Sequence, residues 1–290
     1  MAIIVDQNSR IIIQGITGAS GSAMAERMCK YYSNMLGGVS PGKGGQTVAG
    51  RPVFDFVHEA VDALRADTSA IVVPAPFAKE ALMEAVDAGI KTVWVYSDRM
   101  PLHETIEMIY YAKQNGVRLI GPNAAGVVSP GRASISDLNE ESLPLIPGKI
   151  GLAAKSGSLN VEAVSLLHEA GYGFSSVVSM GGEPFSGTTF TDVLQLFKED
   201  EETDAVIMLG EIGGSDEVDC IPIIQQLGKP LMAYISGHTA PQKKTMGHAG
   251  AIASSTSETA EGKSKALRGA GIPVADYIEE IPDFIRKILP

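Results

Sequence analysis

The sequence predicts an α/β fold built from two units, each with a parallel sheet covered by helices, and three observations support this prediction. Short β-branched runs alternate with longer helical patterns along most of the 290 residues, which is typical of βαβ units. The strand-like runs are rich in apolar, β-branched residues, as expected for strands of a parallel sheet that is covered on both faces. A stretch with Pro, Gly and acidic residues and no clear periodicity, 129–147, interrupts the pattern and is the best linker candidate. We therefore expect one unit over 1–128 and a second over 148–290.

The first unit begins with a strand over 10–15 that ends in a Gly-rich turn, and a helical pattern follows over 20–32. A glycine just past the last periodic residue marks the end of a helix, and two later helical patterns end in this way. In chain order, the remaining elements expected in this unit are strand 70–73, helix 77–88, strand 91–96, helix 102–115 and strand 118–121.

The second unit repeats the alternation, so its strands are also expected to lie parallel. It begins with a strand over 148–153. The further strands expected are 175–179, 205–209 and 231–235, and the helices are 160–170, 190–200, 219–227 and 259–270.

Charge and composition exclude several function classes. The chain has 23 basic and 34 acidic residues, a net charge of -11 at pH 7, and no Lys/Arg-rich run, so it lacks the surface that neutralises phosphates in nucleic-acid binding. No run approaches the roughly 20 apolar residues of a membrane span, and the start lacks a signal-peptide pattern. We expect a cytoplasmic protein with neither a nucleic-acid nor a membrane partner. Cys29 and Cys220 are too few for a disulfide framework or a multi-cysteine metal site, so we expect free thiols and no metal site.

The Gly-rich turn after the first strand is a candidate phosphate-binding site. Its sequence, GITGASG over 15–21, opens a helix, so free N–H groups and the helix dipole can hold a phosphate there. A tight strand-to-helix turn explains the glycines equally well. The spacing G-x-x-G-x-x-G differs from the dinucleotide fingerprint, and no clear ribose-binding acid follows about 20 residues later. This pattern argues against an NAD-binding oxidoreductase.

A second Gly-rich stretch, GGVSPGKGG over 37–45, comes close to the P-loop pattern. It has Gly44 where a Mg²⁺-binding hydroxyl is required, and no clear strand-loop-helix context surrounds it, so we reject a Walker motif. Two interpretations remain for Lys43: it presents its charge to a phosphate from a flexible loop, or it is a solvated surface lysine.

His248 lies among small residues in the stretch MGHAGA, 246–251. Because nothing bulky beside it fills a core, it is a candidate nucleophile or acid–base group. Neutral imidazole can attack a phosphoryl group through one nitrogen when the other donates to a carboxylate. Glu211 follows a buried strand run, at a carboxyl end where α/β sites form, and can supply that carboxylate; the alternative is an acid that favours a helix N-terminus. Residues 156–158 open a helix after a strand and provide either a second anion site or a simple N-cap.

Six motifs, in order along almost the whole chain, together resemble the α subunit of succinyl-CoA synthetase, the ADP- or GDP-forming succinate–CoA ligase. The motifs are GVSPGKGG (38–45), VPAPF (73–77), GPN (121–123), SGS (156–158), GEIGG (210–214) and GHAGA (247–251). The resemblance implies an N-terminal Rossmann-like CoA-binding domain and a C-terminal flavodoxin-like domain that carries a phosphorylated histidine.

The resemblance also assigns roles to residues. It makes His248 the histidine that carries phosphate and Glu211 the glutamate that orients it. The residues that it implies for the CoA site are Thr17, Gly18, Ala19, Ser20, Lys43, Tyr96, Ser97 and Asp98. The residues that it implies for stabilising the phosphoryl group are Ser156, Gly157 and Ser158.

A partner subunit follows from the same resemblance. It implies an αβ or α₂β₂ assembly in which a β subunit with an ATP-grasp fold binds ATP or GTP with Mg²⁺. The implied reaction has three steps: the nucleotide phosphorylates His248, the phosphate moves to a small carboxylic acid, and the CoA thiolate displaces phosphate to give the thioester. A phosphohistidine avoids releasing the acyl phosphate to water.

The chain departs from the family pattern where the acid should bind. Val161 stands where the family has a substrate-contacting tyrosine, and losing that hydroxyl changes which substrate oxygens can be paired. The family's Ile-Gly-Ile-Gln-Pro-Gly stretch is lost within 134–145, and residues 257–260 and 265–267 resemble ATP-citrate lyase. Citrate, malate and sulfoacetate are therefore alternatives to succinate. An inactive CoA-binding regulatory module is the alternative from another class, against which the retained histidine and glutamate argue.

Overall fold

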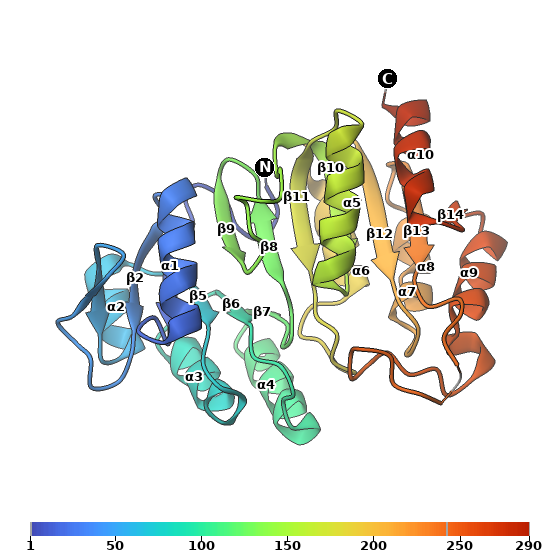
Figure 1. The fold of residues 1–290 in the computed structure, drawn as a ribbon. Coiled ribbons are helices and arrows are strands. Elements are labelled where there is room, and N and C mark those ends of the chain that lie inside the picture. Colours follow the sequence, from blue (N-terminus) through green and yellow to red (C-terminus); the bar gives the residue numbers. More distant parts are fainter. Residues whose placement is uncertain (1, 242, 290) are drawn as a thin grey trace.

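In the computed structural model, which describes residues 2–241 and 243–289, the chain forms two seven-stranded sheets that lie side by side (Figure 1). Helices cover both faces of each sheet, so most strands are buried throughout and are rich in apolar residues. The α/β class predicted from the sequence is confirmed.

The first sheet has the strand order β3-β4-β2-β1-β5-β6-β7. Its neighbouring strands are parallel except for β3, which is antiparallel to β4. The chain passes from β1 to β2 on one side and later to β5 on the other, as in a Rossmann-like sheet, and ligands bind where such an order reverses. The strands are β1 (Ile11–Gln14), β2 (Met35–Val39), β3 (Thr47–Val48), β4 (Arg51–Phe54), β5 (Thr68–Ile71), β6 (Thr92–Val95) and β7 (Arg118–Ile120). The helices are α1 (Ala19–Tyr31), α2 (Val57–Leu64), α3 (Ala75–Asp87) and α4 (Leu102–Gln114).

The second sheet has the order β14-β13-β12-β10-β11-β8-β9. Its five parallel strands follow the flavodoxin-like order, with the reversal at β10, and an antiparallel hairpin of β8 and β9 extends one edge. The strands are β8 (Gly126–Ser129), β9 (Ala133–Ser136), β10 (Pro147–Ala154), β11 (Phe174–Ser179), β12 (Ala205–Gly210), β13 (Leu231–Ile235) and β14 (Val274–Ala275). The helices are α5 (Gly157–Glu169), α6 (Phe190–Glu199), α7 (Asp216–Asp219), α8 (Ile221–Ile224), α9 (Ala260–Gly269) and α10 (Ile281–Ile288), with short 3₁₀ turns η1 (Thr256–Glu258) and η2 (Ile278–Glu280).

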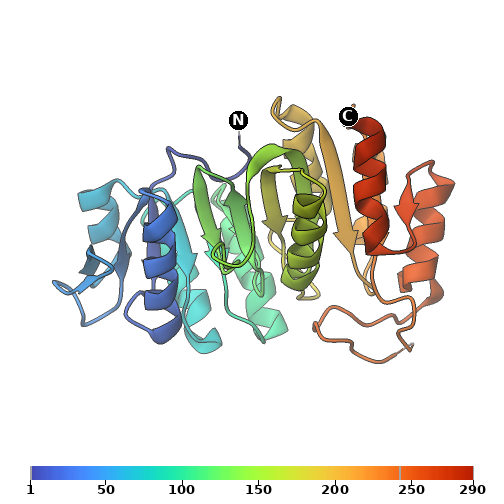
Figure 2. The same ribbon diagram turned by 45° about the horizontal axis from the view of Figure 1, so that its top comes forward.

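The parallel strands of both sheets end at the same edge of the molecule, the lower edge in Figure 1. Figure 2 shows the orange-red segment 243–258, which lies between β13 and α9, passing below this edge of the second sheet. The loops that follow the strands of both units are thereby brought together at one edge.

The segment 129–147, expected as a linker, differs from that expectation. The expected boundary after residue 128 falls inside β8, and β9 also lies within the second sheet. The chain before β1 packs there too, because Ile3 N donates to Ser176 Oγ and Ser129 Oγ donates to Val5 O. Both strands of the hairpin have only four residues and are buried on both faces, so neither shows a periodicity that the sequence could reveal.

Other elements also differ from the prediction, and those that the sequence did not predict include β2, β3, β4, α2, β14 and α10. β2 was not predicted, because two of its five residues are the glycines Gly37 and Gly38; a Cβ at Gly38 would lie 2.5 Å from Ile13 O of the neighbouring strand. The Lys43 stretch therefore follows a strand, which the sequence did not reveal. The helix expected over 219–227 is instead the two short helices α7 and α8, with Pro222 at the start of α8, where proline has no N–H to continue the earlier helix.

Candidate functional site

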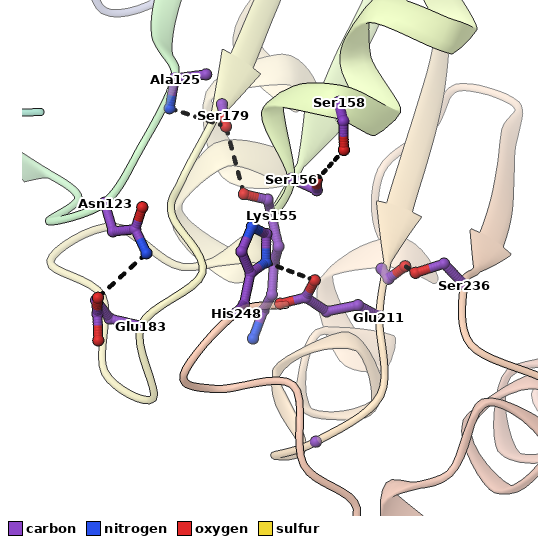
Figure 3. A network of polar contacts seen from close by, with 12 residues as sticks. Asn123, Ala125, Lys155, Ser156, Ser158, Ser179, Glu183, Glu211, Ser236 and His248 are labelled. Carbon is purple, nitrogen blue, oxygen red and sulfur yellow. Dashed lines mark hydrogen bonds and ion pairs between the residues drawn. The ribbon is translucent and has the colours of Figure 1, made fainter. Parts of the chain in front are cut away.

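The carboxyl edge of the second sheet gathers the residues predicted for phosphate transfer (Figure 3). Glu211 directly follows β12, Ser156 is the N-cap of α5 after β10, and His248 lies in the segment between β13 and α9. Because the carboxyl ends of parallel strands meet at one edge of a sheet, these distant parts of the chain converge.

His248 is held by Glu211. The Nδ1 atom of His248 lies 2.8 Å from Glu211 Oε2, and the two side chains are 28% and 9% exposed. This hydrogen bond raises the pKa of His248, while partial burial and the charge of Lys155 act in the opposite direction. In the neutral imidazole that donates Nδ1–H to the carboxylate, the Nε2 lone pair is free to attack an electrophile.

Glycines in three loops make room for the imidazole. A Cβ at Gly182, in the loop after β11, would lie 2.2 Å from His248 Cγ, which no real contact allows. Gly250 N donates to Gly182 O over 2.9 Å. Gly213, after β12, has φ +90°, and its ideal Cβ would lie 2.1 Å from Gly250 O. The three loops therefore fit together only with glycine at these positions, which fixes the place of the ring.

The N-terminus of α5 lies close to this pair (Figure 3). Ser156 Oγ and Ser158 Oγ are hydrogen-bonded to each other over 2.9 Å, and within the described residues no side chain caps the helix. Its first N–H groups thus form an anion-binding terminus. Lys155 lies beside the imidazole in Figure 3, and a further polar pair, Asn123 Nδ2 donating to Glu183 Oε1 over 3.1 Å, is drawn on its left.

One cavity of about 600 Å³ is shared by the two units. The sequence-predicted residues that line it are Gly18, Ala19, Ser20, Tyr96, Ser97, Asp98, Gly157 and His248. Asp137 also lines it, and burial raises the pKa of that carboxyl to about 6. The cavity connects the N-terminus of α1 in the first unit with the histidine of the second.

Thr17 and Lys43 are not part of the lining of this cavity. Thr17 Oγ1 donates to Ser40 Oγ over 3.0 Å, which ties the Gly-rich turn after β1 to the loop after β2. Lys43 is exposed on that second loop. A second, more apolar cavity of about 490 Å³ lies at the ends of β1 and β2, with Val39, Pro41 and Phe77 among its lining residues.

Val161 lies in the second turn of α5 with 43% of its surface exposed. It is not part of the lining of the shared cavity. A larger side chain has room at this position.

Cys29 is half-buried and Cys220 buried, and both thiols are free. Across residues 2–241 and 243–289, no three His, Cys, Asp or Glu side chains form a group able to hold a metal ion. None of the helices described is both long and apolar enough to cross a bilayer.

Several residues beside the site were given no role by the sequence, although Gly182 and Glu183 belong to a stretch, 181–184, that departs from the family's Gly-Gly-Asp-Pro pattern. Gly182 and Glu183 follow a predicted strand, so their place after a strand end was an available signal. A second pair, Lys263 and Glu217, lies beneath Glu211. These two gave no signal, because a lysine or glutamate within a helical pattern is typical of an exposed surface.

Comparison with known families gives two matches. Residues 6–98 match the CoA binding domain family, which covers the Gly-rich turn, Lys43 and the residues after β6. Residues 154–272 match the CoA-ligase family, which covers the N-terminus of α5, Glu211 and His248.

Curated relatives match over the whole chain. Succinate–CoA ligase [ADP-forming] subunit alpha 1 of Archaeoglobus fulgidus is 46% identical over 100% of this chain and 99% of its own length. Malate–CoA ligase subunit alpha of Methylorubrum extorquens is 42% identical, over 95% of this chain and 94% of its own.

Solved structures of longer chains share the fold. ATP citrate lyase from Methanothrix soehngenii, in complex with citrate and coenzyme A, superposes with a TM-score of 0.90 at 25% identity, covering 99% of this chain and 50% of that one. The dinucleotide-forming acetyl-coenzyme A synthetase 1 of Ca. Korarchaeum cryptofilum, with phosphate and ADP, has a TM-score of 0.79 at 20% identity, covering 97% of this chain and 61% of that one. The chain therefore spans half to three-fifths of the solved chains it matches.

Proposed function

Since the chain belongs to the family of succinate–CoA ligase α subunits, we propose that it transfers phosphate through His248 in a ligase that joins a small carboxylic acid to CoA. The observation that carries this proposal is the His248–Glu211 pair, joined over 2.8 Å, beside the N-terminus of α5 and open to the cavity shared by both units. A histidine, an orienting carboxylate and an anion-binding helix terminus are the groups that a phosphohistidine needs.

In the first step, Nε2 of His248 attacks the γ-phosphorus of a nucleoside triphosphate, and the nucleoside diphosphate leaves. Glu211 accepts the Nδ1 proton in a hydrogen bond and so stabilises the positive charge that develops on the ring. The first N–H groups of α5, at Ser156, Gly157 and Ser158, receive the phosphoryl oxygens. Loss of either group, the Glu211 carboxylate or the N–H groups of α5, would slow this step.

In the second step, a carboxylate oxygen of the acid attacks the phosphorus and Nε2 leaves, which gives an acyl phosphate and regenerates the imidazole. In the third, the CoA thiolate attacks the acyl carbon and inorganic phosphate leaves. Gly18, Ala19 and Ser20 at the N-terminus of α1 would bind CoA phosphate, with the thiol reaching His248 through the 600 Å³ cavity.

A partner polypeptide supplies the nucleotide in this proposal. The curated relatives are named as α subunits, and the solved citrate lyase chain is about twice as long as this one. Both facts support a partner β subunit. We propose that this subunit has an ATP-grasp fold and binds ATP or GTP with Mg²⁺, in an αβ or α₂β₂ assembly.

Two candidates remain for the carboxylic acid substrate, succinate and a hydroxy acid. Succinate has the support of the relatives' names, while the relative named for malate and the citrate lyase structure support a hydroxy acid. Val161 keeps both candidates open, because the loss of a tyrosine hydroxyl changes which substrate oxygens can be paired. Citrate, malate and sulfoacetate are therefore tested beside succinate.

The test is a labelling and discharge experiment on the chain co-expressed with its β subunit. We expect γ-phosphate-labelled ATP or GTP to give an acid-labile, base-stable label on the wild type. His248→Ala should lose the label, while His238→Ala, at an exposed histidine, should keep it. The acid that discharges the label together with CoA identifies the substrate.

Absence of label from an assembled complex with either nucleotide would overturn the phosphohistidine. CoA binding that persists in such a complex would instead support the regulatory module.

A further inference from the structure

A fully buried ion pair lies beneath the candidate site. Lys263, on α9, and Glu217, on α7, both have 0% exposed side chains, and Lys263 Nζ contacts Glu217 Oε2. Burying two charges away from water costs free energy that the pair itself often does not repay. Apolar residues of similar volume would stabilise a core at least as well, so stability alone gives no reason for charge at these positions.

The ion pair holds both backbone polar groups of Glu211. Lys263 Nζ donates to Glu211 O over 2.8 Å and to Gly213 O over 2.6 Å. Glu217 Oε1 accepts from Glu211 N over 3.1 Å. An ammonium group has three N–H donors, and here the two carbonyl oxygens and the Glu217 carboxylate use all three.

The segment around Glu211 is rich in glycine, so its backbone would be flexible without these contacts. Gly210, Gly213 and Gly214 surround Glu211, and the last two have positive φ angles of +90° and +60°, so the backbone has more freedom here than elsewhere. Gly210 makes room for the pair, since a Cβ there would lie 2.5 Å from Glu217 Cγ. Gly213 in turn contacts the His248 loop at Gly250.

We propose that Lys263 and Glu217 are positioning residues that fix the peptide of Glu211 so that its carboxylate meets Nδ1 of His248. Their role in catalysis rests on the proposed phosphohistidine, but their effect on the histidine does not. Neither residue touches His248; they act through Glu211 alone. The charged groups that do act on the imidazole are Glu211, Glu183 and Lys155.

The test is the pKa of His248 in the double variant Lys263→Met/Glu217→Gln, measured by histidine NMR titration of the full chain. Removing both charges avoids leaving one of them buried and unpaired. Because the hydrogen bond that His248 donates to Glu211 is the main cause of the raised pKa, we expect the pKa of His248 to fall toward its ordinary value. His248→Gln assigns the resonance.

Two controls on α9 separate positioning from general damage. Lys265→Met removes an exposed lysine, and Leu267→Ala destabilises the same helix from its fully buried face without touching Glu211. Both should leave the pKa of His248 at its wild-type value. An unchanged pKa in the folded double variant overturns the proposal, and so does an equal fall in Leu267→Ala.

A second variant keeps the test decisive if the double variant does not fold. Lys263→Met alone removes the donor that holds Glu211 O and Gly213 O, and the Glu217 carboxylate left behind can be neutralised by taking up a proton. We expect the pKa of His248 to fall toward its ordinary value in this variant, and an unchanged pKa would overturn the role of Lys263.

In the assembled enzyme, the double variant should label about 10²-fold more slowly, as expected for a displacement near 1 Å, with the KM for CoA unchanged. The titration requires neither nucleotide nor partner. A lowered pKa in a protein that never becomes labelled would thus remove the proposed function and leave the positioning role intact.

Discussion

At the scale of single residues, the His248–Glu211 contact predicts a stability that depends on pH. Glu211 raises the pKa of His248 above the ordinary value of about 6.5 that it has in an unfolded chain. A group whose pKa is raised on folding stabilises the fold below the unfolded value, and this contribution is lost as the pH rises through the folded value. We therefore expect the free energy of unfolding of the wild type to exceed that of His248→Gln most below about pH 6.5, and the difference to shrink at higher pH.

Urea unfolding at a series of pH values measures this difference. Glu211→Gln is the control background, because a neutral amide no longer favours the charged imidazole. In the Glu211→Gln background, the effect of His248→Gln on the free energy of unfolding should lose most of its dependence on pH. A difference between wild type and His248→Gln that is constant with pH would contradict the prediction.

Gly182 carries a second prediction at this scale. A methyl group there would lie 2.2 Å from His248 Cγ, so Gly182→Ala must displace either the imidazole or the loop after β11. Because a displacement near 1 Å costs about 10²-fold in rate, we expect labelling of His248 to slow by this factor while the fold and CoA affinity persist. Gly269→Ala is the matched control, since nothing lies within 4 Å of its ideal Cβ. Equal labelling rates in the two variants would show that the loop adapts.

At the scale of helices and strands, elements with a strong local pattern could be predicted and short ones could not. β11, β12 and β13 coincide with predicted runs to within one residue, because each is a short run with several apolar residues between loop segments. β8 and β9 were missed because four residues are too few to establish a period.

The same limit applies to the candidate site. His248 and Glu211 are marked by glycines beside them, whereas Lys263 and Glu217, 46 residues apart, meet only in the fold. A sequence pattern can indicate a functional side chain when small residues stand beside it in the chain. It cannot indicate that a charged side chain is buried by elements that are distant in the chain.

The exposed face of α5 gives a prediction about the acid. Val161 is 43% exposed, so a tyrosine fits there without displacing core residues. We expect Val161→Tyr to raise kcat/KM for succinate relative to malate on the order of 10-fold, because the added hydroxyl pairs with a substrate oxygen. Steady-state rates of the assembled enzyme with each acid measure the ratio. Glu162→Tyr, at the exposed next position, should leave it unchanged, and an unchanged ratio in Val161→Tyr would remove this helix from acid selection.

At the scale of the whole molecule, the two units supply different groups to one cavity. The N-terminus of α1 belongs to the first unit and His248 to the second. One cluster of buried apolar side chains runs across both, from Ile13 through Trp94 to Val178, so packing holds the two edges together. In our proposal, CoA binding and phosphate transfer are thus assigned to separate elements, which this packing holds together.

This separation predicts that the two steps can be impaired independently. Lys43 is exposed on the loop after β2, and in our proposal its ammonium pairs with a CoA phosphate. A charge-assisted hydrogen bond contributes roughly 1.5–3 kcal/mol, so we expect Lys43→Met to raise the KM for CoA by about 10- to 10²-fold. Labelling of His248 should keep its wild-type rate, because that step does not use CoA.

Lys91→Met, at an exposed lysine elsewhere in the first unit, is the control and should change neither quantity. The double variant Lys43→Met/Glu211→Gln extends the test. Because effects at sites without shared partners add in free energy, the fold-losses of the two single variants in kcat/KM for CoA should multiply. Slower labelling in Lys43→Met alone would mean that the loop after β2 also affects phosphorylation of His248. The proposed separation of CoA binding from phosphate transfer would then be wrong.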